Sequence, residues 1–229
     1  MRHLRGGEWS SRRGSGRAKL DGMSLQHSRP SEHRHPATLG LSLRRWRTLN
    51  RVKQSHAAEL FGVGQSTVSR WENGLQIMET AERIKVETVI AANVDAAADG
   101  VLAQLVSDAS RPVHLVCDYT HRLLACSAPR EREFGRPISQ LRGRSMFRYA
   151  SDEIAMQEAL LETRGWYDFP TPEPIVMHTG ANRSRIVRIK PSCCRWTRLT
   201  LSTGAVVRLV ETLQPLETPA IQSGRSENR

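Results

Sequence analysis

The chain has 229 residues, with 34 Lys and Arg against 23 Asp and Glu, and a formal net charge of +11. This length suffices for two small domains and flanking tails. No apolar run approaches the roughly 20 residues of a membrane-spanning helix. The basic N-terminus is not followed by the apolar core of a secretory signal. We therefore expect a cytoplasmic protein without contact to a membrane.

The positive charge is concentrated near the N-terminus. Residues 1–36 carry eight Lys and Arg against three acids, and residues 37–73 carry six against two, which leaves a net charge of +2 for the rest. Such an excess would be attracted to a phosphate backbone. Residues 1–36, with Met23 as an alternative start, have no apolar clusters to offset chain entropy and are predicted to be a disordered basic tail. Residues 215–229 are predicted to be a second disordered tail.

The first predicted helix lies within residues 39–51. Its apolar stripe consists of Leu39, Leu43, Trp46 and Leu49. Its polar face carries Arg44, Arg45, Arg47 and Arg51. A second helix is predicted to begin near Gln54. The buried face of this second helix is predicted to contain Ala57, Ala58, Leu60 and Phe61.

A tight turn and a third helix are predicted to follow. Gly62 would end the second helix, since glycine can adopt the left-handed conformation that such a turn demands. Val63 is predicted to be a buried turn residue. The third helix would open at Gly64 and run to Trp71, with Val68 and Trp71 on its buried face. The residues expected on its other faces are Gln65, Ser66, Thr67, Ser69 and Arg70.

Residues 39–93 resemble the Cro/C1-type (XRE-like) helix-turn-helix family. The matching residues are Arg47, Gln54, Ala58, Gly62-Val63, Val68-Ser69 and Trp71-Glu72-Asn73-Gly74. The resemblance implies an ion pair between Arg47 and Glu72. Lys53 departs from the family, since a residue with a hydroxyl or acidic side chain usually caps the helix there. Absence of such an N-cap lowers helix stability by about 1 kcal/mol. We take residues 37–93 as an α-helical DNA-binding domain.

The resemblance also implies how this domain would bind operator DNA. The residues implied at base edges are Gln65, Ser66, Thr67 and Arg70, with Arg70 on a base or the backbone. The residues assigned to phosphates are Gln54, Arg44, Arg45 and Arg51. A homodimer would read half-sites roughly 34–36 Å apart. The alternative is an antitoxin-like or adaptor module that uses these helices to bind a protein partner.

Two further helical segments follow. Residues 79–92 are predicted to complete the first domain, with apolar positions at Ile84, Val86 and residues 89–92. Residues 94–110 are predicted to be a helical linker whose stripe consists of Val101, Leu102, Leu105 and Val106. Asp99-Gly100 is a potential break in it. This stripe is equally consistent with a dimerisation seam and with packing onto its own domain.

Residues 111–214 read as an α+β domain. Strands are predicted at residues 113–117 and 123–126 around a turn at 118–121, followed by a short helix at 129–134 and a loop through Gly143. A helix capped at Ser151 is predicted to run to about Thr163. The residues expected on its inner face are Ile154, Ala155, Ala159 and Leu160. Three strands are predicted at residues 175–178, 185–190 and 196–202, and a last strand at 205–212.

This order of two strands, short helices and three strands resembles a PAS-like sensor domain. The segments that carry the resemblance are residues 113–118, residues 122–126, Gly135 and residues 141–143. The asparagine that often follows the second strand is replaced by Cys126-Ser127. The resemblance implies an antiparallel sheet and a domain that senses a signal, such as a small-molecule ligand, or holds a dimer. The alternative is an unrelated α+β domain that only dimerises the chain.

No pattern for catalysis or metal binding is evident. The cysteines, which are Cys117, Cys126, Cys193 and Cys194, form no CxxC pair and no zinc spacing, so we expect reduced thiols. The scattered histidines His114, His121 and His178 do not form a ligand set. Since no nucleophile elbow, phosphate loop or HExxH sequence occurs, we expect no enzyme, cofactor or metal. The sequence favours a sequence-specific transcriptional regulator; a small-molecule sensor with incidental DNA contact is a second alternative.

Overall fold

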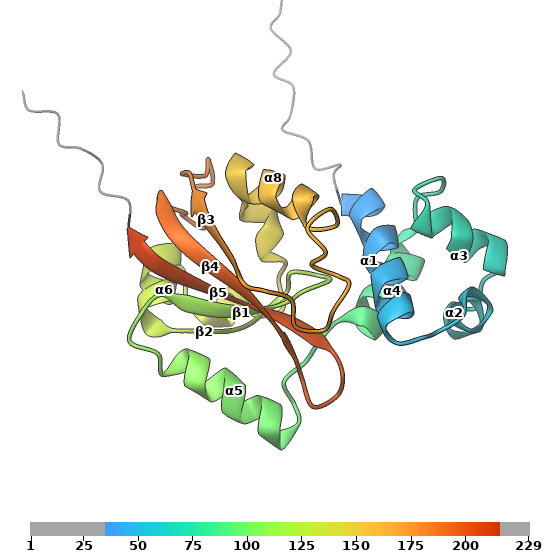
Figure 1. Cartoon of the computed structure of the whole chain (residues 1–229), viewed down its shortest axis with the longest axis horizontal. Coiled ribbons are helices and arrows are strands. Elements are labelled where there is room, and N and C mark those ends of the chain that lie inside the picture. The colour runs from blue at the N-terminus through green and yellow to red at the C-terminus, as the bar shows by residue number, and fades with distance from the viewer. Residues whose placement is uncertain (1–34, 216–229) are drawn as a thin grey trace, which may run out of the picture. The chain divides into compact units, whose positions relative to one another are not determined.

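The computed structural model describes residues 35–215 (Figure 1). The predicted disordered tails lie outside this range, except that residues 35 and 36 belong to a helix and residue 215 ends a strand. Within residues 35–215, no helix has both the length and the hydropathy needed to cross a bilayer.

Four helices make up the first part of the described chain: α1 (His35–Leu49), α2 (Gln54–Phe61), α3 (Gln65–Glu72) and α4 (Thr80–Ile90). Their core contains Leu43, Val68 and Val86, which are fully buried. The chain turns after α2 because Gly62 has φ 69 and its N–H bonds to the carbonyls of Ala58 and Glu59. Only Gly62–Gly64 separate α2 from α3, so the two helices pack at a fixed angle.

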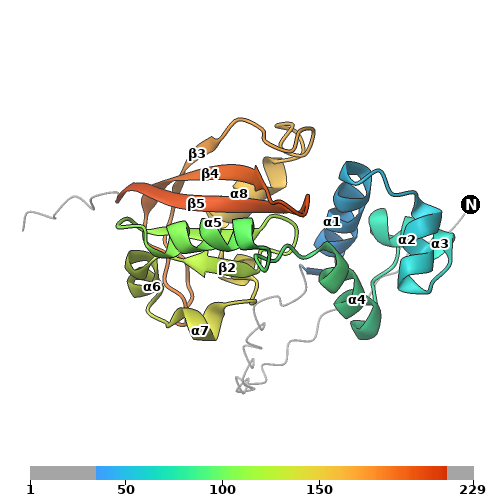
Figure 2. The ribbon, with the colours of Figure 1, turned by 90° about the horizontal axis from the view of Figure 1, so that it is seen from below.

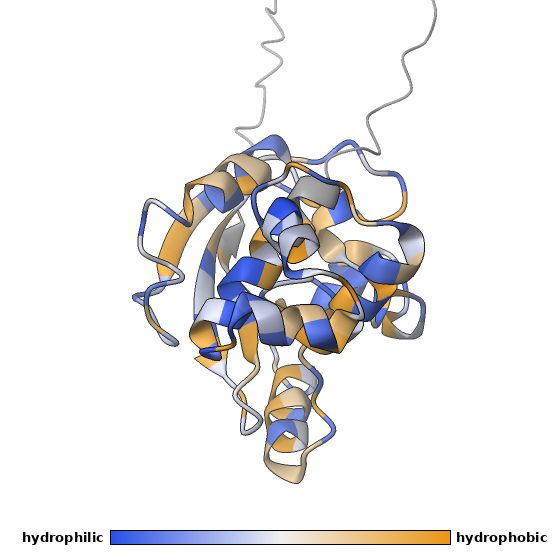
Figure 3. Ribbon diagram, turned by 90° about the vertical axis from the view of Figure 1, so that its right-hand side faces the viewer, coloured by the Kyte–Doolittle hydropathy of each residue, from blue (hydrophilic) through white to orange (hydrophobic). Residues whose placement is uncertain are grey.

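Helix α5 (Ala97–Ser107) packs on the sheet through the buried Val106. The Asp99-Gly100 pair does not break it: the Gly100 N–H bonds to the Ala96 carbonyl, and the Asp99 carboxylate accepts hydrogen bonds from the N–H and hydroxyl of Ser202. Figure 3 shows apolar residues recurring along α5. Two of the four predicted stripe residues, Val101 and Leu105, are 61% and 66% exposed, so the stripe packs onto its own domain only in part.

After α5 the chain forms one antiparallel sheet of five strands, in the order β2-β1-β5-β4-β3. The strands are β1 (Val113–Cys117), β2 (Leu123–Cys126), β3 (Ile175–Thr179), β4 (Ser192–Thr200) and β5 (Val206–Pro215). Between β2 and β3 lie α6 (Ala128–Phe134), α7 (Ile138–Leu141), the 3₁₀ helix η2 (Met146–Tyr149) and α8 (Asp152–Leu160). Two strands, short helices and three strands are the predicted PAS-like arrangement, and this expectation is confirmed for the domain.

The two faces of the sheet are covered differently (Figure 2). Helix α5 covers the face that carries Leu115 and Cys117, and both residues belong to the same apolar cluster as Val106. The opposite face carries Val116, which packs with Phe134 of α6. Because side chains alternate along a strand, residues 115 and 117 face α5 and residue 116 faces α6. We call the face toward α6 the inner face of the sheet.

The predicted strand at residues 185–190 is wrong. The segment is a loop because Asn182 binds the backbone groups that a ladder would use: its amide donates to the carbonyl oxygens of Tyr149 and Val187, and its Oδ1 accepts from the Ile189 N–H. The following strand begins instead at Ser192, four residues earlier than predicted. The predicted loop before Gly143 contains the short helix α7.

Two predicted buried faces are also corrected. In α2, Leu60 is 51% exposed, whereas the neighbouring Phe61 is buried in the core. In α8 the buried residues are Gln157 and Glu158, while the predicted Leu160 is exposed. The exposed Ala159 likewise does not point inward. The reason for the α8 rotation is an ion pair between Glu158 and Arg208 across the inner face of the sheet.

Candidate functional site

The first candidate site is the outer face of α3. Gln65, Ser66 and Arg70 are exposed and Thr67 is half-buried. The opposite side of the helix is fixed by the buried Val68, Trp71 and Glu72. The structure therefore places all four residues predicted at base edges on one short helix, three of them open to solvent.

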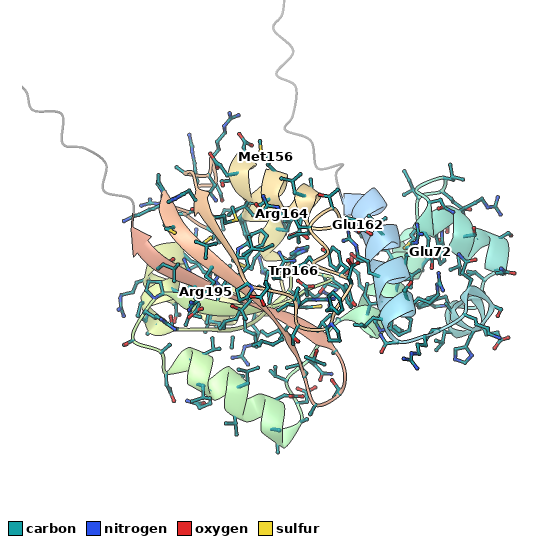
Figure 4. The ribbon with its side chains drawn as sticks, viewed as in Figure 1. Glu72, Met156, Glu162, Arg164, Trp166 and Arg195 are labelled. Atoms are coloured by element: carbon teal, nitrogen blue, oxygen red, sulfur yellow. The ribbon has the colours of Figure 1, made fainter. Side chains whose placement is uncertain are left out.

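A polar network fixes α3 relative to α1 and α2. Glu72, labelled in Figure 4, accepts hydrogen bonds from Arg47 Nε at 2.8 Å and Arg47 Nη2 at 3.0 Å. These hydrogen bonds raise the pKa of the Arg47 guanidinium. Gln54 Nε2 donates to the same carboxylate at 2.9 Å, and its Oε1 lies 3.5 Å from Gln65 Nε2. Gln54, predicted to contact phosphate, is half-buried, and its hydrogen bond to Glu72 links α2 to α3.

The arginines assigned to phosphates differ in their surroundings. Arg44 and Arg51 are exposed. Arg70 is exposed as well, and its Nε donates to the Ser66 carbonyl. Arg45 is less open than these residues: its side chain is 13% exposed, it donates to Glu162 at 2.7 Å, and it stacks over Tyr167 at 3.7 Å. A phosphate contact by Arg45 would have to compete with these two neighbours.

The second candidate site is a cavity of about 90 Å³ inside the PAS-like domain. It lies between the inner face of the sheet and the helices that cover it, with apolar walls that include Val116, Phe134 and Trp196. Polar side chains from β1, α6 and β5 also reach it, namely His114, Arg130, Arg208 and Thr212. A largely apolar hollow with a few polar groups is the general form of a small-molecule site.

One end of the cavity is formed by His114 and Arg130, which are 9% and 8% exposed. Burial and the nearby charge of Arg130 lower the pKa of His114 well below its usual range, so the imidazole is neutral. Arg130 donates to Glu133 at 2.7 Å and to Thr212 at 2.8 Å. Both His114 and Arg130 lie against the Phe134 ring.

The other end is a buried charge network. Asp118 accepts hydrogen bonds from Arg198 and Arg208, each at 2.8 Å. Arg208 also donates to Glu158 at 2.6 Å. Burial by itself would raise the pKa of Glu158, but the charges of Arg208 and His121 hold it well below its usual range. The Glu158 carboxylate therefore stays ionised, and with Arg208 it borders this end of the cavity.

An indole completes the network. Trp166, labelled in Figure 4, is buried and donates from Nε1 to both oxygens of Asp118, at 3.3 and 3.2 Å. Its carbonyl accepts from Arg198. Each charged group in the network thus has polar partners, which is the condition for burying charge without a large penalty.

Sequence reasoning missed most of this second site. Asp118 was predicted only as a turn residue, and Arg198 and Arg208 only as members of strands. The one available signal was the position of the two arginines in the strands. Arg198 falls in the same alternating set as Cys194 and Trp196, and that set faces inward.

The cysteines do not form a reactive or metal-binding group. All four are free, and burial raises the pKa of Cys126 and of Cys194 to about 11. Thiols with such pKa values stay protonated at neutral pH. Within residues 35–215 no group of three or more His, Cys, Asp or Glu is arranged to hold a metal ion.

Comparisons with known proteins found similarity only at the level of structure. No protein-family model matches the chain, and no curated protein matches it. The PAS domain of an HTR-like protein from Haloarcula marismortui is 15% identical with a TM-score of 0.38, over 50% of this chain and 89% of that chain. The PAS domain of BvgS from Bordetella pertussis is 13% identical with a TM-score of 0.33, over 52% of this chain and 85% of that chain.

A third solved structure, an RNA-binding light-oxygen-voltage receptor, is 11% identical with a TM-score of 0.38. The match covers 78% of this chain, which spans 59% of the length of that receptor. At such TM-scores these similarities carry no argument about activity. The description of residues 113–215 as PAS-like rests on the order and pairing of the five strands.

Proposed function

We propose that this protein is a sequence-specific DNA-binding transcriptional regulator whose PAS-like domain senses a signal. In this proposal residues 37–93 form a Cro/C1-type helix-turn-helix domain, and α3 enters the major groove. Gln65, Ser66 and Thr67 read base edges, and Arg70 contacts a base or the adjacent backbone. The regulator acts in the cytoplasm as a homodimer on a two-fold operator.

The observation that carries the proposal is the exposed polar face of a helix whose other face is fixed. Arg47, Gln54 and Glu72 hold α3 against α1 and α2, so its outer residues are presented on a rigid support. Rigid presentation favours specific recognition, because less order must be created on binding. The exposed Arg44 and Arg51 supply positive charge for the phosphate backbone on the same helical unit.

The cavity supports the sensing role. It is mainly apolar and bordered by buried polar groups, which suits a small-molecule signal. The alternative function, binding of a protein partner by the same helices, would use the exposed apolar side chains between and beside them. Leu75 and Ile77, which are both exposed in the segment after α3, are the observation that favours it.

The test is a genomic-fragment selection with the purified full chain. Wild type is compared with a Gln65→Ala, Ser66→Ala double variant and with a control, Glu59→Ala, which changes an exposed α2 residue away from the outer face of α3. Enrichment of one motif by wild type and by the control, but not by the double variant, is the expected result. Equal recovery by all three proteins would overturn the proposal and leave charge-driven, unspecific binding or a protein partner as the function.

A further inference from the structure

Two buried polar atoms at one end of the cavity have no hydrogen-bond partner among residues 35–215: His114 Nδ1 and Arg130 Nε. Both residues line the cavity, and both are more than nine-tenths buried. Leaving a buried donor unpaired is costly, and such groups are uncommon in folded proteins. Two of them beside one cavity indicate that a ligand supplies the missing partner.

The hydrogen bonds of Arg130 define what kind of group is missing. Its Nη1 donates to Glu133, and its Nη2 donates to Thr212 and to the carbonyl of Pro112. These bonds fix the plane of the guanidinium and leave Nε–H as the free donor. The required partner is therefore a hydrogen-bond acceptor. Neutral His114 can carry its proton on Nδ1 and donate to the same acceptor, since a carbonyl oxygen has two lone pairs.

The charges around the cavity are already balanced. Arg130 is paired with Glu133, and Arg208 is paired with Glu158 and with Asp118. Asp118 is shared with Arg198. Each arginine in or behind the wall thus has a carboxylate. A bound anion would add an uncompensated buried charge, which is strongly unfavourable, so the acceptor belongs to an uncharged group.

The size of the cavity limits the rest of the molecule. Its volume is about 90 Å³. An apolar protein cavity of roughly 150 Å³ holds benzene. The space between the walls therefore suits ligands with fewer non-hydrogen atoms than benzene. Val116, Phe134 and Trp196 require that the body of the ligand be apolar.

We propose that the cavity binds a small uncharged carbonyl compound, with an apolar body, whose oxygen accepts hydrogen bonds from Arg130 Nε and His114 Nδ1. This proposal rests on the sensing role given above to the PAS-like domain. It concerns binding alone, so it can be tested without DNA and can fail independently of operator recognition.

The test uses three probes of equal size and shape on the full chain: butanone, 2-methyl-1-butene and propionate. The alkene replaces the carbonyl oxygen by a methylene group, and propionate adds a negative charge. Dissociation constants are obtained from shifts of backbone amide signals in NMR titrations. Butanone is expected to bind at least about tenfold more tightly than the alkene, because the alkene leaves both donors unpaired. It should also bind more tightly than propionate.

Variants identify the site. Arg130→Met and His114→Leu should each reduce the preference for butanone over the alkene, because each variant removes one of the two donors. His114→Leu removes an unpaired buried polar group, so the ligand-free variant should unfold at a higher temperature than wild type. Ala150→Leu fills part of the cavity and should weaken binding of all probes. The matched control Ala159→Leu alters an exposed residue of α8 and should bind as wild type does.

Three results would overturn the proposal. Equal affinities for butanone and the alkene would show that the polar end does not recognise the ligand. Tighter binding of propionate would make the site an anion site. Binding of no probe, with unchanged amide signals, would mean that the cavity takes water only. A failed genomic selection with intact butanone binding would reject operator recognition while leaving the ligand site standing.

Discussion

The guanidinium of Arg47 in α1 forms a bidentate ion pair with the carboxylate of Glu72 at the end of α3. Gln54 of α2 adds a third hydrogen bond to the same carboxylate. Glu72 is only 3% exposed, so its carboxylate oxygens depend on these donors for hydrogen bonds in the core. Three helices thus meet at one carboxylate, and that carboxylate sets the position of the proposed recognition helix.

Removing this carboxylate should lower the free energy of unfolding. Glu72→Ala leaves Arg47 without its partner, and breaking a buried ion pair typically costs about 3–5 kcal/mol. We expect a loss of that order in urea unfolding followed by circular dichroism. Glu59→Ala, at an exposed position of α2, serves as the control and should change stability by less than about 0.5 kcal/mol. A loss below about 1 kcal/mol for Glu72→Ala would contradict the assigned role.

Two glycines in the same helices should respond differently to alanine. At Gly62, φ is 69 and a Cβ would meet no atom, so Gly62→Ala carries only the cost of a left-handed residue, about 1–2 kcal/mol. At Gly40 a Cβ would overlap the carbonyl oxygen of Trp71. The crossing of α1 and α3 must then open, and we expect a loss of at least about 3 kcal/mol. Thermal unfolding of both variants measures the difference, and an equal loss would contradict this helix crossing.

His114 should make stability depend on pH. Burial, with the charge of Arg130, lowers its pKa in the folded protein, whereas the unfolded chain binds a proton near the ordinary value of about 6.5. The unfolded state therefore binds more protons below that pH, and folding stability should fall as the pH is lowered from about 6.5. The slope contributed by one such group approaches about 1.4 kcal/mol per pH unit.

The measurement is urea unfolding of wild type and of His114→Leu between pH 7 and pH 5. The difference in unfolding free energy between the two proteins should grow in favour of the variant as the pH falls. His178→Leu, at an exposed position of β3, serves as the control. A difference that does not vary with pH would mean that His114 has the same pKa in the folded and in the unfolded protein, which would contradict the lowered pKa.

Two polar residues of the helical domain should affect DNA affinity in distinct ways. Gln65→Ala should relax specificity at one base position by about 1–3 kcal/mol. Arg44→Gln removes an exposed positive charge and should weaken all sequences alike, with a salt slope reduced by about one. Fluorescence anisotropy at several salt concentrations separates the two effects. Identical behaviour of both variants would show that these residue roles are wrong.

The sequence predicted elements best where local pattern and tertiary burial agree. Gly62 ends α2 because its left-handed conformation is a local property that the residue type reveals. Leu60 was misassigned because it lies at the edge of the buried face of α2, which consists of Ala57, Ala58 and Phe61. Apolar character alone could not show that Leu60 lies outside this face.

The cavity and the charge network beside it could not be predicted because their polar residues come from distant parts of the chain. Asp118 follows β1, whereas Arg198 and Arg208 lie in β4 and β5, and charged residues in strands are ordinarily read as exposed. The misplaced strand at residues 185–190 has a similar cause. Ile186, Val187 and Ile189 favour a strand locally, but the Asn182 side chain takes the backbone groups of this segment.

The central claim, that α3 reads a specific operator, is tested most directly by a ratio of two dissociation constants. The full chain is titrated with the selected fragment and with a shuffled fragment of the same composition at one salt concentration near physiological. We expect a ratio of about 10³ or more for wild type, reduced by at least about tenfold in the Gln65→Ala, Ser66→Ala double variant. A ratio near one, with affinity that falls steeply as salt rises, would contradict the claim.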